Sequence, residues 1–212
     1  MISADKMMNK AKGPLWHKKQ KEKGIIPKGL RGIDKKATWG KSNTDGWVYG
    51  HGSFSVVSHK APFLGCFIWM PNSGNEARKL WHEIFHLKGL VKYAAMDSKA
   101  DDYDLFRELK RQRKINLITS CRKKMDKTPN RQKMKAFMEQ PYHKKIYKER
   151  ATRVEPMQAL VKDIFELDHC WMRGDKSNQW LFAAMGLTIQ MHQLTAFKEK
   201  RSTWKIKDQV LG

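Results

Sequence analysis

Short strand-like runs and stretches of helical periodicity alternate between residues 47 and 120. Residues 47–59 and 61–70 have the aromatic and β-branched composition of two strands, and they predict an antiparallel hairpin. Over residues 72–88 the apolar positions recur every three or four residues, which predicts an amphipathic helix. The change of period from two to 3.6 therefore places a helix directly after the hairpin.

The same alternation continues beyond the hairpin and its helix. The apolar run 90–96 predicts a short buried strand, residues 103–114 a helix, and residues 115–120 another short strand. From residue 129 onward the periodicity is helical, with long helices that include residues 154–167 and 178–200. This order predicts an α/β fold in which helices cover a mixed sheet with parallel members.

Two segments carry little periodicity. Residues 13–46 are rich in Gly, Pro and Lys and predict a long loop, and residues 201–212 predict a flexible basic tail. The organisation expected is one domain over residues 1–200, followed by that tail. The helix over 178–200 is apolar enough to be largely buried.

The net charge indicates a polyanionic partner. Lys and Arg number 43 against 21 acidic residues, which gives +22. Such a surplus is typical of proteins that bind nucleic acid, and it exceeds what solubility requires. The basic residues are spread among the apolar segments, so we expect a folded domain with positive faces.

Several classes of protein are not indicated. The three cysteines are widely separated and predict neither a disulfide framework nor a zinc site. The sequence lacks a glycine-rich phosphate loop, and residues 50–53 (GHGS) do not form a serine-hydrolase motif. No run is long enough to predict a membrane span, and residues 1–12 do not resemble a signal peptide, so a cytoplasmic protein is expected.

Asp97 is the most informative single residue. It directly follows the apolar run 90–96, and open α/β folds place their sites at the carboxyl ends of parallel strands. The nearby Asp101, Asp102 and Asp104 make this stretch acidic within a basic chain, which favours cation binding. The alternative is that Asp97 only caps the next helix.

Two further acidic residues carry weaker local signals. Glu155 lies in a helix with an apolar face, and Lys162 follows seven residues later on the same side. The alternative is an exposed pair without a role. Asp5 follows only Met1–Ala4, a stretch too short to predict a strand.

Together these segments resemble the DDE transposases of bacterial insertion sequences. Residues 94–102, followed by a basic helix and a strand that leads to Arg122, resemble the block of the second aspartate. Residues 147–174 are similar to the family's Tyr-Arg-Glu-Lys signature. Its members here are Tyr147, Arg150 or Arg153, Glu155 and Lys162.

Asp5, with residues 11–17, resembles the family's first-aspartate block, although Asp34 and Asp45 are rival candidates for that carboxylate. The family usually carries a DNA-binding domain before the first aspartate, so the resemblance implies a chain truncated at its N-terminus. It also implies a ribonuclease H-like fold in which the first strand is central.

The resemblance implies a DNA strand cleavage and transfer enzyme. Asp5, Asp97 and Glu155 would bind two Mg²⁺ ions as catalytic carboxylates. The partners implied are the terminal inverted repeats, the target DNA and a second copy of the chain, in a bacterial, nucleoid-associated protein. The DNA-binding residues implied are Tyr147, Arg150, Arg153, Lys162 and Arg122. Two alternatives stay open: a non-catalytic DNA-binding remnant that inhibits an intact transposase, and another ribonuclease H-like nuclease.

Overall fold

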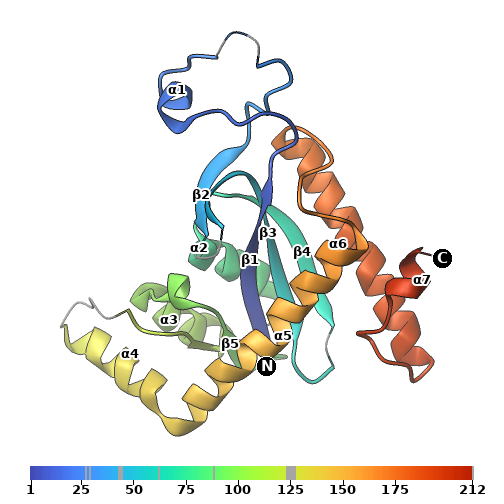
Figure 1. Ribbon diagram of the computed structural model, residues 1–212. Coiled ribbons are helices and arrows are strands. Elements are labelled where there is room, and N and C mark those ends of the chain that lie inside the picture. The colour runs from blue at the N-terminus through green and yellow to red at the C-terminus, as the bar shows by residue number, and fades with distance from the viewer. Residues whose placement is uncertain are drawn as a thin grey trace. The chain divides into compact units, whose positions relative to one another are not determined.

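The computed structural model describes residues 1–26, 28, 30–42, 45–61, 63–87, 89–122 and 128–211. In this part of the chain the α/β class is confirmed, with helices beside a mixed sheet (Figure 1). The strands are β1 (Ile2–Lys10), β2 (Thr38–Ser42), β3 (Gly46–Ser58), β4 (Leu64–Pro71), β5 (Tyr93–Ala95) and β6 (Asn116–Ile118). The α-helices are α1 (Lys18–Glu22), α2 (Glu76–Glu83), α3 (Tyr103–Glu108), α4 (Pro129–Glu139), α5 (Pro141–Ile164), α6 (Asp175–Lys198) and α7 (Lys207–Leu211). Shorter turns are the 3₁₀ helices η1 (Phe85–Leu87) and η2 (Ser98–Ala100) and the π-helical η3 (Leu109–Arg113).

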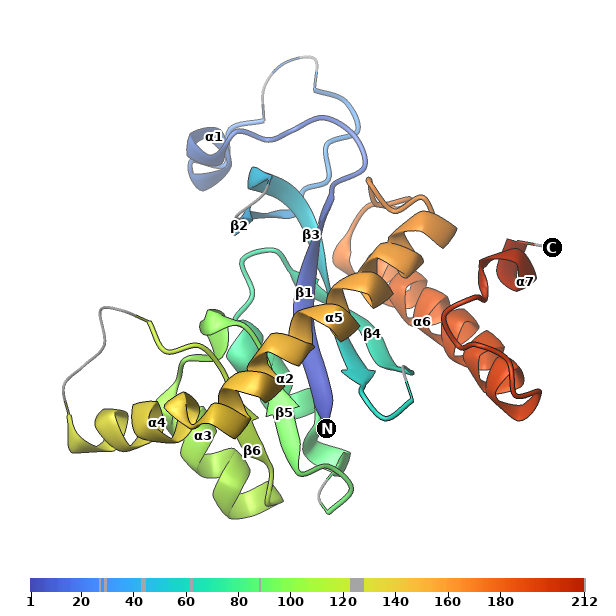
Figure 2. The ribbon, with the colours of Figure 1, turned by 60° about the horizontal axis from the view of Figure 1, so that its bottom comes forward.

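The sheet has the order β2-β3-β1-β5-β6, and β4 also pairs with β3 (Figures 1 and 2). β1 runs antiparallel to β3. His59 N donates to Met1 O at 3.1 Å near one end of the pair, and Ala11 N donates to Tyr49 O at 2.9 Å near the other. The predicted pairing of the strands over 47–59 and 61–70 is confirmed as β3 and β4.

On its other edge β1 is parallel to β5, and β5 is parallel to β6. Ile2 lies opposite Ala94 and Ser3 opposite Ala95. All four of these residues are buried. The two parallel strands predicted over 90–96 and 115–120 are therefore present, shorter than the apolar runs suggest.

The described chain divides into two compact units, and each is considered by itself. One unit contains residues 1–5, 55–66 and 75–158, and the second contains residues 6–54, 67–74 and 159–212. In the first unit, α3 packs against α2, α4 and β6. Its core includes Leu80, Leu109 and Leu117, none of which exposes any surface.

β1 has nine residues, although the four residues before Asp5 are too few to predict a strand. Its second half is polar in sequence, yet Asn9 is only 1% exposed. The Asn9 amide donates to His51 O and to Ser53 Oγ, both at 3.3 Å. Because groups on β3 accept hydrogen bonds from the Asn9 amide, a polar residue can be buried here, and the sequence of this half of β1 shows no apolar alternation.

Residues 13–46 are not the plain loop that the sequence predicts, because α1 and β2 form there. The segment has its own small core, in which Trp16, Ile33 and Ala37 pack with Tyr49. Trp39 Nε1 also donates to Trp16 O at 2.9 Å. Single aromatic and aliphatic residues among Gly and Lys carry this core, so no periodic pattern announces it.

Within the second unit, α6 packs against β4 at a close approach. A Cβ on Gly186 would lie 2.9 Å from the Cβ of Phe67, so only glycine fits there without a shift. The rings of Phe67 and Phe182 meet edge to face at 5.7 Å. Beyond α6, the stretch predicted as a tail contains α7, and Ile206 is fully buried.

Among the described helices, none combines the length and the apolar character that crossing a membrane would take.

Candidate metal centre and the basic cavity beside it

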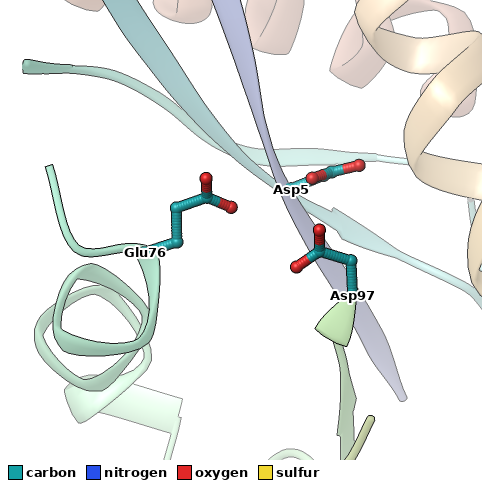
Figure 3. A group of neighbouring side chains, drawn as sticks. All are labelled: Asp5, Glu76 and Asp97. Atoms are coloured by element: carbon teal, nitrogen blue, oxygen red, sulfur yellow. The ribbon is translucent and has the colours of Figure 1, made fainter. Parts of the chain in front are cut away.

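Three carboxylates from three separate elements meet in the first unit. Asp5 lies in β1, Glu76 is the first residue of α2, and Asp97 follows β5. One carboxylate oxygen from each lies within 4.8 Å of the other two (Figure 3). We refer to this group of Asp5, Glu76 and Asp97 as the acidic cluster.

The register of the sheet accounts for the pairing of Asp5 with Asp97. Since Ser3 lies opposite Ala95 in parallel strands, the same register places Asp5 opposite position 97. Neighbouring strands are about 4.8 Å apart, and residues two apart on a strand point to the same face. Two aspartates in these positions must therefore share one face of the sheet at adjacent places.

The third carboxylate comes from the start of a helix. Asn75 caps α2, and its side chain accepts a hydrogen bond from Arg78 N at 3.0 Å. Glu76 is then in the first turn, where the helix dipole favours a negative charge. Its side chain is only 1% exposed, which is unusual for a glutamate and requires a charged partner.

Two basic side chains hold the acidic cluster. Lys99 Nζ lies 2.7 Å from Glu76 Oε1. Burial of this ammonium lowers its pKa, but the hydrogen bond it donates to Glu76 and the charges of the neighbouring carboxylates outweigh that effect, so the pKa of Lys99 is raised. Arg150 Nη1 lies 3.0 Å from Asp5 Oδ2, and the Arg150 side chain is 11% exposed. Lys99 and Arg150 thus each place a positive charge against one carboxylate of the acidic cluster.

The donor set fits a hard divalent cation. Carboxylate oxygens are the ligands that Mg²⁺ prefers, and two or three of them leave coordination positions for water or phosphate oxygens. Lys99 and Arg150 contact the acidic cluster at Glu76 and Asp5. Both cations end flexible side chains, which can move away from the carboxylates.

Of the residues that the sequence analysis assigned to metal binding, Asp5 and Asp97 come together and Glu155 does not join them within the described chain. Glu155 is 59% exposed, and its Oε1 lies 3.7 Å from Arg150 Nη2. Arg150 therefore contacts both Asp5 and Glu155.

Glu76 is the residue that the sequence analysis missed. The available signal was local: a helix N-cap, Asn75, precedes an acidic residue and then the buried Ala77. An acidic first turn occurs in many helices because of the dipole, so this pattern alone does not select a ligand.

The rival first carboxylates have other surroundings. Asp34 is buried in the second unit, where Oδ2 accepts from Gly174 N and faces His51 Nε2, each at 2.9 Å. Trp69 Nε1 donates to His51 Nδ1 at 3.0 Å, so Nε2 of this histidine must carry the proton. Asp45 is exposed, and Ser42 Oγ donates to it at 3.2 Å.

The residues predicted to bind DNA have the following contacts. Arg122 Nε donates to Ser98 O at 3.0 Å, and the Arg150 guanidinium lies 5.8 Å from the centre of the Tyr147 ring. Lys162 lies in the second unit, where Nζ is 2.7 Å from Asp168 Oδ1. Burial and then the positive charge of Arg153 lower the pKa of His59.

A basic cavity of about 400 Å³ opens at the end of β6 in the first unit. It adjoins the acidic cluster, because the Thr119 hydroxyl on its wall donates to Asp97 O at 2.5 Å. Four cationic side chains and one acidic side chain line it, together with the half-buried Tyr147. The charged lining residues are Arg122, Lys135, Lys144, Lys148 and Glu139.

Comparisons of the chain with models of protein families, with curated proteins and with solved structures find no match.

Proposed function

We propose that this chain cleaves phosphodiester bonds in nucleic acid with Mg²⁺ held by Asp5, Glu76 and Asp97. The observation that carries the proposal is the approach of three carboxylates within 4.8 Å, from three separate elements. The class of protein is a metal-dependent nuclease with a ribonuclease H-like fold. That fold is supported by the central place of β1, antiparallel to β3 and parallel to β5.

The roles divide between the acidic cluster and the side chains around it. When bound, Mg²⁺ would lower the pKa of an attacking water and neutralise charge on the phosphate. Asp5, Glu76 and Asp97 would hold the ion with oxygen ligands. Lys99 contacts Glu76 and Arg150 contacts Asp5, and these positive charges limit the repulsion among the three carboxylates.

The basic cavity supports nucleic acid as the substrate class. Its cations include Arg122 and Lys148, and Tyr147 offers an aromatic face to a base. The cavity begins at Thr119, whose hydroxyl bonds the backbone of Asp97. A nucleic-acid strand cleaved at the acidic cluster would pass beside this cavity, where these cations would bind its phosphates.

A second candidate is the DDE transposase that the sequence resembles, with Glu155 as third carboxylate and DNA ends as substrate. One contact favours it: Arg150 contacts both Asp5 and Glu155, so these two carboxylates share one cationic partner whose place a metal ion would take. In this case Glu76 would contribute its negative charge near the metal without binding it.

The experiment is a cleavage assay with labelled single-stranded DNA, duplex DNA, RNA and RNA–DNA hybrid, with and without Mg²⁺. Isosteric variants Asp97→Asn, Glu76→Gln and Glu155→Gln are compared with wild type. Asp104→Asn serves as the control, because this aspartate side chain is 79% exposed. We expect Asp97→Asn and Glu76→Gln each to lower the rate at least about 100-fold, and Glu155→Gln and Asp104→Asn to retain it.

The other outcomes separate the alternatives. If Glu155→Gln loses cleavage and Glu76→Gln retains it, the third metal ligand is Glu155, and the transposase proposal takes the place of the nuclease proposal. Strand transfer of a labelled 3′ end into target DNA would point the same way. DNA binding without any cleavage by the wild-type chain would reject catalysis and leave the DNA-binding remnant.

A further inference from the structure

α6 has one buried apolar face and a second apolar face that is exposed. The buried face includes Phe182, Met185 and Ile189. On the opposite side Trp180 is 80% exposed, Leu187 57%, Met191 61% and Leu194 48%. With Ala184, these four residues form a stripe, here called the α6 stripe. The expectation that this helix is largely buried is therefore met on one side only.

The spacing of the α6 stripe is that of a coiled-coil seam. Its members, Trp180, Ala184, Leu187, Met191 and Leu194, follow one another at intervals of four, three, four and three. This is an average of 3.5 residues, the repeat that keeps a seam facing a partner helix along its length. Core-facing helices of a single domain usually show a wider apolar face instead.

The stripe is also free of charge in a highly charged chain. Residues 177–197 contain no Lys, Arg, Asp or Glu. With 30% charged residues overall, a stretch of 21 would ordinarily hold about six. Nucleic acid would find no cation on this surface, and two copies of a +22 chain could meet here without juxtaposing like charges.

We propose that the α6 stripe is the contact surface of a homodimer, in which α6 of one copy packs against α6 of another. Leu187 is the middle of the stripe, with Trp180 and Leu194 seven residues away on either side. A two-fold axis at Leu187 places Leu187 against Leu187 of the second copy, and Trp180 of each copy against Leu194 of the other, which is the reciprocal pairing of an isologous interface. This inference does not depend on the proposed nuclease function.

The area available sets the strength of the dimer. A large side chain has about 200 Å² of surface, so the exposed fractions amount to about 500 Å² in each copy. The pair would bury about 1,000 Å², which is near the lower limit of specific interfaces. We therefore expect a reversible dimer whose population rises with protein concentration.

The test is sedimentation equilibrium of the full chain over a range of concentrations. Nucleic acid is removed first, and salt is kept high so that residual nucleic acid cannot bridge two copies. The mass of wild type should rise from 24.8 kDa toward twice that value. Leu187→Glu and Met191→Glu, both at exposed positions, should raise the dissociation constant at least about 100-fold because a charge would be buried against apolar side chains.

Gln179→Glu is the matched control. It adds the same charge to an exposed position of the same helix, about a quarter turn from the stripe, and should leave the dissociation constant unchanged. Circular dichroism checks that every variant keeps its helices. Leu187→Cys should also form an intermolecular disulfide on oxidation faster than wild type does.

A wild-type chain that stays monomeric at all concentrations would overturn the proposal. So would a dimer that Leu187→Glu does not weaken, or a dimer that Gln179→Glu weakens equally.

Discussion

Replacing Asp34 with asparagine tests whether this carboxylate is a structural anchor of the second unit. Asp34 is 2% exposed, and each of its two oxygens faces backbone or ring N–H donors. Oδ2 faces His51 Nε2 and Gly174 N at 2.9 Å, while Oδ1 accepts from Lys36 N at 3.0 Å and Ala37 N at 3.3 Å. An asparagine has one oxygen, so either orientation of its amide turns an NH₂ group toward two donors.

His51 cannot relieve this conflict by changing tautomer. Its Nδ1 already accepts from Trp69 Nε1, which can only donate. Asp34→Asn therefore loses at least two buried hydrogen bonds to a charged acceptor, each worth about 1.5–3 kcal/mol. The expected loss in the free energy of unfolding is about 3–6 kcal/mol, a large part of the about 5–15 kcal/mol of a typical domain.

Urea unfolding followed by circular dichroism and tryptophan fluorescence measures this loss near neutral pH. His51→Gln is a milder second variant, which keeps the comparison usable if Asp34→Asn does not fold. Asp45→Asn is the control, since Asp45 is exposed and should change stability by less than about 0.5 kcal/mol. A loss below about 1 kcal/mol in Asp34→Asn would refute the reasoning from the hydrogen-bond network.

The pH dependence of the Asp34 contribution has a definite sign. Burial raises the pKa of Asp34, but the hydrogen bonds from His51, Gly174 and Lys36 have the larger combined effect, so the pKa is lowered from 3.8. A carboxylate with a lowered pKa stabilises the folded state above its ordinary value, and that contribution is lost as the pH falls through the folded-state value. The difference in the free energy of unfolding between wild type and Asp34→Asn should therefore become smaller at acidic pH.

Two other predictions concern the first unit. Burial, followed by the positive charges of Arg153 and the N-terminus, lowers the pKa of His59 from 6.5 to about 4. Between pH 6.5 and about 4 the unfolded chain therefore binds a proton at His59 that the folded chain does not bind. The free energy of unfolding should decrease as the pH falls through this range, and it should decrease less in His59→Gln. Thermal unfolding over this range checks it, and equal slopes in both proteins would count against it. In the basic cavity, Arg122→Ala with Lys148→Ala should reduce the slope of log affinity for duplex DNA against log salt by about 2. Lys198→Ala with Lys200→Ala, outside the cavity, is the control, and an unchanged slope in the cavity variant would mean that these cations do not contact phosphates.

Much of the element order could be predicted from periodicity, because regularly spaced or consecutive apolar residues are buried in each of β3, β4, α2, β5 and β6. β1 and the segment over 13–46 could not. In β1 the amide nitrogen of the buried Asn9 donates to side-chain and backbone groups of β3, which are distant in sequence. In the segment over 13–46 single residues such as Trp16 form a core with Tyr49. Contacts of this kind depend on tertiary structure and leave no local period.

The acidic cluster separates what local sequence can predict from what it cannot. Asp97 follows an apolar strand, and that position alone predicts a place at the carboxyl edge of a parallel sheet. Its partner Asp5 has no such local signal and is a candidate only through the family resemblance. The register explains the pairing, since Ser3 opposite Ala95 places positions 5 and 97 opposite each other.

The third carboxylate is harder to predict from the sequence, because a helix packed against a sheet can place any of several residues near the same position. Both α2 and α5 supply an acidic residue near Asp5, and sequence spacing favours Glu155 on α5 through the family signature. Burial discriminates between them: the Glu76 side chain is 1% exposed, whereas that of Glu155 is 59% exposed. A carboxylate removed from water is costly unless it has a charged partner, and Lys99 is such a partner for Glu76. Because the Glu155 side chain is exposed, water stabilises its charge without a buried cation.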